Sequence, residues 1–102
     1  PSQPCLASRI PFGEEISAKR LKQIGLAEEW IINLGFKSVR VRNQGLSGRI
    51  ELPSDEIENF LQSVPKEKII KYFLSIGFTS VSIDLEGLIS GKLNRDRKLL
   101  NN

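Results

Sequence analysis

Apolar residues recur along the chain at two different spacings, which together predict three helices and three strands. In the first half, apolar positions three or four residues apart predict an amphipathic helix that begins after an N-cap at Ser17 and ends at Gly35. Gly35 suits a left-handed C-terminal cap, and Phe36 can fold back onto the last turn. The apolar face of this helix contains Leu21, Ile24, Ala27, Ile31 and Leu34.

The pattern then changes to strict alternation, which is typical of half-buried strands. Residues 38–42 and 48–52 alternate between apolar and polar, and the turn residues at 43–45 predict that the two strands form a hairpin. Helical spacing returns in a short helix capped by Ser54 and in a third helix that ends at Gly77. These two helices carry Ile57, Phe60, Leu61 and Val64, then Ile69, Ile70, Phe73, Leu74 and Ile76. The last strand is expected over 79–85.

Alternation also assigns the strand side chains to two faces of a sheet. The apolar face, expected to pack on the helices, contains Val39, Val41, Ile50, Leu52, Val81, Ile83 and Leu85. The opposite face contains Arg40, Arg42, Arg49, Glu51, Ser82 and Asp84. That polar face is either a solvated surface with cross-strand ion pairs or an anion site, because a guanidinium fork matches phosphate and carboxylate.

The sequence repeats one local pattern, since residues 34–41 reappear in similar form as residues 76–83. The repeat is either a coincidence of a common helix-to-strand junction or the sign of two αβ units related by a pseudo-twofold. The second interpretation places the first and third strands side by side and antiparallel, with the second strand at an edge. We therefore expect an α+β fold in the order α-β-β-α-α-β: a small three-stranded, mainly antiparallel sheet with helices on one face, resembling half of a ferredoxin-like fold.

Composition limits the function classes. A length of 102 residues suits one domain, and the absence of Met suggests a fragment or processed domain. The net charge of +3 is too small for a nucleic-acid surface, and no apolar run approaches the roughly 18 to 20 residues of a membrane span. One Cys cannot form an internal disulfide and no secretory leader is evident, so a cytoplasmic protein is expected. The lack of His excludes imidazole chemistry.

The single cysteine, Cys5, lies in the segment Pro4-Cys5-Leu6-Ala7-Ser8-Arg9-Ile10-Pro11-Phe12-Gly13. Residues 1–16 are expected to form an ordered arm without regular secondary structure. A thiolate is reactive where it is accessible and close to positive charge, and Arg9 could supply that charge. The alternative is a small, inert cysteine packed beneath a loop.

This segment resembles the central motif of the ATP-dependent sacrificial sulfur transferases (LarE type, PP-loop superfamily), which help to build the nickel-pincer nucleotide cofactor. The resemblance continues through Leu34-Gly35-Phe36, Val39-Arg40-Val41-Arg42, Gly48-Arg49-Ile50-Glu51, Asp84-Leu85-Glu86-Gly87 and Ser90-Gly91. It implies that residues 1–102 are the C-terminal catalytic or substrate domain of an enzyme whose N-terminal PP-loop pyrophosphatase domain is absent. ATP and Mg would be bound through that absent domain and no cofactor by this chain alone, and the family forms oligomers.

The resemblance also implies roles for individual residues. Cys5 would donate its sulfur to an adenylated carboxylate, and Glu29 would accept a proton. An anionic, nucleotide-like substrate would contact Ser8, Arg9, Arg40, Arg42 and Arg49, with Glu51, Asp84 and Glu86 as supporting acids. No metal ligand is assigned. The chain departs from the family pattern at Asn43 and Gln44, where two His are common, and at Ile89, where an Arg is common.

Two other functions are compatible with the sequence. The chain could be a non-catalytic substrate-binding or oligomerisation module of a PP-loop enzyme, in which case Cys5 has no chemical role. An RNA-binding accessory domain is the weaker alternative, because the predicted sheet lacks exposed aromatic residues that stack bases.

Overall fold

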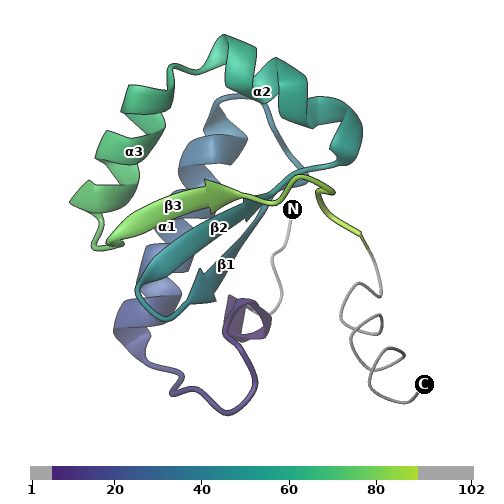
Figure 1. Cartoon of the computed structure of the whole chain (residues 1–102). Helices are drawn as coiled ribbons and strands as arrows, with labels where there is room; N and C mark the ends of the chain where they lie inside the picture. Colours follow the sequence, from purple (N-terminus) through teal and green to yellow (C-terminus); the bar gives the residue numbers. More distant parts are fainter. Residues whose placement is uncertain (1–5, 90–102) are drawn as a thin grey trace.

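The computed structural model describes residues 6–89 and contains three α-helices and a three-stranded sheet (Figure 1). The helices are α1 (Ala18–Asn33), α2 (Ile57–Ser63) and α3 (Lys66–Ser75), and the strands are β1 (Arg40–Gln44), β2 (Ser47–Glu51) and β3 (Ser80–Ile83). Two 3-10 turns, η1 (Leu6–Arg9) and η2 (Ser54–Glu56), complete the structure. The turn η1 corrects the expectation of an arm without regular structure. Ser54 starts η2 instead of capping a helix, because the chain enters α2 through this turn.

Helix α1 begins and ends as its sequence predicts. The Ser17 side chain accepts a hydrogen bond from the backbone N–H of Arg20 at 3.1 Å. At the other end Gly35 has a φ of +108°, and the N–H of Phe36 donates to the carbonyl of Ile31 at 3.3 Å. This is a Schellman cap, which requires the left-handed backbone that glycine adopts without strain.

The same cap closes α3, so the repeated sequence pattern corresponds to a repeated structure. Gly77 has a φ of +109°, and the N–H of Phe78 donates to the carbonyl of Phe73 at 3.1 Å. Both phenylalanines that follow a cap glycine are buried. Each cap therefore turns the chain directly from a helix into the strand packed beneath it.

The strand order differs from the prediction. The order is β1-β2-β3, with β1 and β2 antiparallel (Val41 opposite Ile50) and β2 and β3 parallel (Ile50 opposite Ile83). Placing the first and third strands side by side was wrong, and the sheet is mixed. The cause is the connection through α2 and α3, which crosses one face and returns the chain to the end where β2 began, so that β3 runs parallel to β2.

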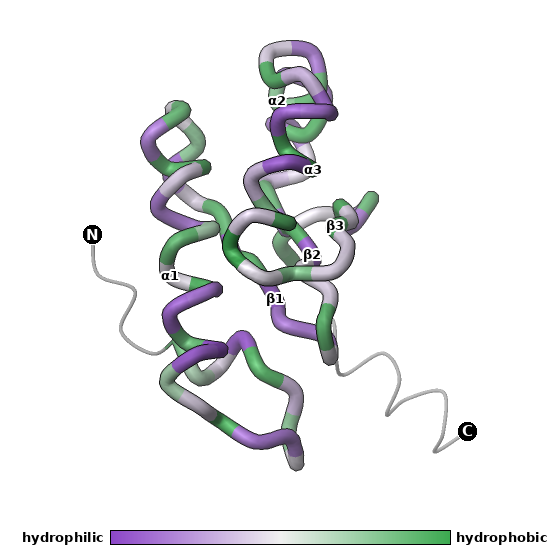
Figure 2. Tube along the Cα trace, turned by 90° about the vertical axis from the view of Figure 1, so that its left-hand side faces the viewer, coloured by the Kyte–Doolittle hydropathy of each residue, from purple (hydrophilic) through white to green (hydrophobic). Residues whose placement is uncertain are grey.

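The core lies between the sheet and the three helices (Figure 2). The buried cluster contains Ala27, Ile31, Phe36, Val39, Val41, Ile50, Leu52, Ile57, Phe60, Val64, Ile69, Phe73 and Phe78. The predicted apolar face of the sheet is confirmed for β1 and β2, but Leu85 is 87% exposed because β3 ends at Ile83. In the part of the chain that the structure describes, no helix has the length and apolar character needed to cross a membrane.

A turn after β3 brings the chain back to the end of β2. Leu88 donates its N–H to the carbonyl of Leu52 at 2.8 Å, and Gly87 sits in this turn with a φ of +83°. A Cβ on Gly87 would collide with that same Leu52 carbonyl and lie 3.1 Å from the backbone nitrogen of Ser54. The close approach of two backbone segments explains why a glycine is required here.

Replacing Gly87 by alanine is therefore expected to destabilise the domain by about 1–3 kcal/mol, measured as the free energy of urea-induced unfolding. Gly13→Ala is the matched control, because Gly13 has a similar φ of +91° but no atom of the described residues would lie within 4 Å of its Cβ. The control isolates the cost of the backbone conformation from the cost of the collision. Equal effects of the two substitutions would contradict the role assigned to the contact with Leu52.

Candidate functional site

An open cleft of about 1220 Å³ lies between the N-terminal arm and the polar face of β1 and β2. The arm lines one side with residues 7–14 and Ile16, and the sheet lines the other with Arg40, Arg42, Asn43, Gln44, Arg49 and Glu51. Leu88 and Ile89, from the turn after β3, complete the lining. The cleft therefore collects most of the residues that the sequence assigned to an anionic substrate.

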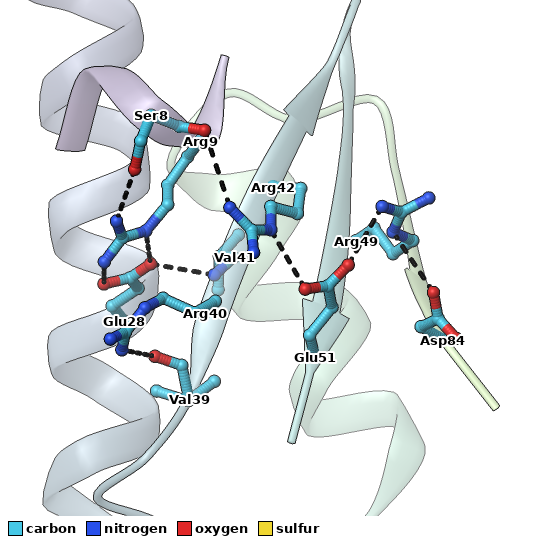
Figure 3. Close-up of polar contacts among 10 residues, drawn as sticks. All are labelled: Ser8, Arg9, Glu28, Val39, Arg40, Val41, Arg42, Arg49, Glu51 and Asp84. Atoms are coloured by element: carbon cyan, nitrogen blue, oxygen red, sulfur yellow. Dashed lines mark hydrogen bonds and ion pairs between the residues drawn. The ribbon is translucent and has the colours of Figure 1, made fainter. Parts of the chain in front are cut away.

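A buried ion pair holds the arm in place (Figure 3). Arg9 Nε lies 2.8 Å from Glu28 Oε2 and Arg9 Nη2 lies 3.3 Å from Oε1, with the side chains only 5% and 2% exposed. The same Oε2 accepts the backbone N–H of Val41 at 2.8 Å, and Ser8 Oγ accepts from Arg9 Nη1 at 2.8 Å. One carboxylate thus joins η1, α1 and the outer edge of β1.

Glu29 is the predicted proton acceptor on this helix, but Glu28 is the glutamate that faces the arm. Glu29 is exposed and does not line the cleft, whereas Glu28 is buried. The available signal was helical phase, because Glu28 is four residues after Ile24 and three before Ile31, both of which are buried. A carboxylate on the apolar stripe of a helix requires a buried partner, and Arg9 supplies it.

On the polar face of the sheet, Glu51 joins two arginines (Figure 3). Its Oε1 accepts from Arg42 Nε and its Oε2 from Arg49 Nη2, both at 2.9 Å. Arg49 Nε lies 3.8 Å from Asp84 Oδ2, which is an ion pair beyond hydrogen-bonding distance. Arg42 Nη1 also reaches the carbonyl of Ser8 at 3.5 Å. The predicted grouping of these charged residues on one face is confirmed.

Arg40 differs from the other two sheet arginines. Its Nη1 donates to the carbonyl of Val39 at 3.0 Å, and within residues 6–89 no carboxylate is close enough to form an ion pair with it. Glu51 and Asp84 offset the charges of Arg42 and Arg49. Among residues 6–89, Arg40 therefore contributes positive charge to the cleft that no carboxylate offsets.

The remaining predicted site residues are less closely associated with the cleft. Asp84 accepts the backbone N–H of Glu86 at 3.0 Å in the turn after β3, and neither residue lines the cleft. Asn43 is buried and its Oδ1 has no hydrogen-bond partner within the described part of the chain, while Gln44 is exposed. Cys5 and the Ser90-Gly91 motif lie outside the described residues. Among residues 6–89, no group of three His, Cys, Asp or Glu side chains could hold a metal ion.

Comparison with known proteins supports the resemblance drawn from the motifs. No family model matches the chain. It is 47% identical over 95 residues (93% of the chain) to an uncharacterized Synechocystis protein, slr1717, and covers 35% of that protein. It is 37% identical over 86 residues (84% of the chain) to an uncharacterized Methanocaldococcus jannaschii protein, MJ0830, and covers 33% of it.

A third relative has a named activity. The chain is 37% identical over 89 residues, 87% of its length, to the pyridinium-3,5-bisthiocarboxylic acid mononucleotide synthase of Lactiplantibacillus plantarum, a LarE protein. It covers 32% of that synthase, so it spans about a third of the length of the curated relatives it matches. By its sequence, the chain is therefore similar to part of a LarE-type synthase.

Proposed function

We propose that this chain is the sulfur-donating, substrate-binding domain of a LarE-type sulfur transferase of nickel-pincer cofactor biosynthesis. The observation that carries the proposal is the 37% identity, over 87% of the chain, to a synthase whose product is a pyridinium bisthiocarboxylic acid mononucleotide. The cleft supports it, because three arginines on a rigid sheet suit a phosphorylated, carboxylated ligand.

Within this proposal the three arginines have different tasks. Arg40 attracts the anion, since within residues 6–89 its charge has no carboxylate partner. Arg42 and Arg49 present guanidinium groups whose orientation is set by Glu51. Arg9, assigned to substrate on the basis of the sequence, instead positions the arm through Glu28.

The proposed chemistry transfers the sulfur of Cys5 to the substrate. A PP-loop domain of the intact protein would use ATP and Mg to convert the substrate carboxylate to an acyl-adenylate, releasing pyrophosphate. The Cys5 thiolate attacks the acyl carbon, AMP leaves, and a thioester forms. A base then removes the Cα proton of Cys5, the electron pair forms a Cα=Cβ double bond, and the Cβ–S bond breaks. The products are a thiocarboxylate and dehydroalanine at position 5, with no net oxidation.

Two neighbouring glutamates on α1 are candidates for the base in this sequence of steps. Glu28 is engaged by Arg9 and by the N–H of Val41, so accepting a proton would disrupt the contacts that hold the arm. Glu29, the sequence-based prediction for the proton acceptor, has an accessible carboxylate on the exposed side of α1. Glu29→Gln therefore tests that assignment without disturbing the buried pair.

The experiment that tests the function is the intact mass of the full-length protein before and after incubation with ATP, Mg and a carboxylated pyridinium mononucleotide. We expect the peptide that contains Cys5 to lose the elements of H₂S, and omission of ATP to prevent the loss. An unchanged mass together with retained substrate binding would instead favour the non-catalytic substrate-binding module.

A further inference from the structure

The rim of the cleft opposite the arginines contains an exposed aromatic side chain on a structured turn. Residues 11–14 form a type II turn, in which the N–H of Glu14 donates to the carbonyl of Pro11 at 3.1 Å and Gly13 has a φ of +91°. This turn type requires a positive φ at its third position, which glycine provides. Phe12 occupies the corner of the turn, and its side chain is fully exposed.

The turn is fixed to the body of the domain on both sides. Before it, Arg9 is held by Glu28. After it, Arg20 Nη1 lies 2.9 Å from Glu14 Oε1 and donates to the carbonyl of Glu15 at 3.0 Å. Phe12 is therefore held in an exposed position by an anchored loop. The domain does not gain the free energy that burying this phenyl ring would provide.

Phe12 belongs to an apolar wall of the cleft. Pro11 and Ile16 of the arm line the same cleft and are also exposed, and Ile89 adds an exposed apolar residue from the turn after β3. The floor opposite this wall carries Arg40, Arg42 and Arg49. A ligand that satisfies both surfaces combines a planar apolar ring with an anionic group.

We propose that Phe12 is a specificity-determining residue that stacks on the aromatic ring of a pyridinium mononucleotide whose anionic groups bind the arginine floor. The inference rests on the proposed function for the floor and adds the ring-recognition element. An electron-poor pyridinium ring suits the negative face of a phenyl group. A purely apolar partner surface fits less well, because it would bury the arginine forks without replacing their hydrogen bonds to water.

The test is calorimetric titration of the 102-residue chain with nicotinic acid mononucleotide and with ribose 5-phosphate, which lacks the ring. Phe12→Leu keeps an apolar side chain but removes the aromatic face. We expect it to weaken binding of the mononucleotide by about 5-fold to 100-fold, and to leave binding of ribose 5-phosphate unchanged. Leu61→Ala is the control, because Leu61 is an exposed apolar residue on α2 outside the cleft lining. It should leave the affinities for both probes unchanged.

A second variant separates this inference from the proposed function. Arg40→Met should weaken binding of both probes, because both carry phosphate. If Phe12→Leu leaves the mononucleotide affinity unchanged while Arg40→Met lowers it, the stacking role is wrong and the arginine floor stands. If Phe12→Leu changes the oligomeric state in place of the affinity, Phe12 is an interface residue and the inference fails. If neither probe binds the wild-type chain at millimolar concentration, both proposals fail.

Discussion

Replacing Glu28 by alanine is expected to lower the free energy of unfolding by about 3–5 kcal/mol, because removing one partner of a buried ion pair leaves the other charge buried without compensation. Here the remaining charge is Arg9, only 5% exposed, and the N–H of Val41 loses its acceptor as well. The total free energy of unfolding of a domain is about 5–15 kcal/mol, so this single substitution would remove a large part of the stability.

Urea-induced unfolding measures this effect, and the helix supplies its own control. Glu29→Ala alters the neighbouring exposed carboxylate and should change stability by no more than about 0.5 kcal/mol. The double variant Arg9→Met with Glu28→Leu replaces the pair by apolar side chains of similar size, and should recover most of the loss. Similar destabilisation by Glu28→Ala and Glu29→Ala would show that the ion pair does not hold the arm.

Replacing Cys5 by serine in the full-length protein is expected to abolish sulfur transfer while leaving substrate binding intact. The serine oxygen can attack an acyl-adenylate only weakly, and the resulting ester contains no sulfur to leave with the product. The wild-type protein should form no more than a single thiocarboxylate per polypeptide, since the donor atom is lost. The measurement is the amount of thiocarboxylate formed per mole of protein, together with the affinity for the substrate.

Ser63→Ala serves as a control for the cysteine substitution, because Ser63 is an exposed serine at the end of α2 and does not line the cleft. It should retain most of the transfer. Undiminished transfer by the Cys5→Ser variant would overturn the donor role and favour the binding-module alternative. Loss of substrate affinity in that variant would instead assign Cys5 to binding.

Local sequence patterns predicted those parts of the structure that depend on near neighbours. The cap at Ser17, the left-handed glycines at 35 and 77 and the two faces of the hairpin are all set by residues within a few positions of one another. Strand order is different, because it depends on how the chain crosses the sheet between β2 and β3. The repeated helix-to-strand junction was visible in the sequence. However, the cap at Gly35 leads into β1 at one edge of the sheet, and the same cap at Gly77 leads into β3 at the opposite edge.

The residues of the candidate site were largely predictable from the sequence, but the contacts between their side chains were less so. Alternation placed Arg42, Arg49 and Glu51 on one face, which the ion pairs confirm. The partnership of Arg9 with Glu28 spans 19 positions and joins a turn to a helix, so no local period indicates it. Phe12 belongs to the motif at residues 4–13. The exposure of its side chain could not be predicted, because it depends on how the turn at 11–14 is anchored.

The Glu28 carboxylate also makes the two borders of the sheet unequal. At β1 it occupies the outward N–H of Val41, so an incoming strand finds that donor already taken. At β3 the exposed positions are Ser80 and Ser82, which carry no charge to repel another chain. Strand addition is therefore less favourable at β1, where the Glu28 carboxylate would have to be displaced from Val41, than at β3.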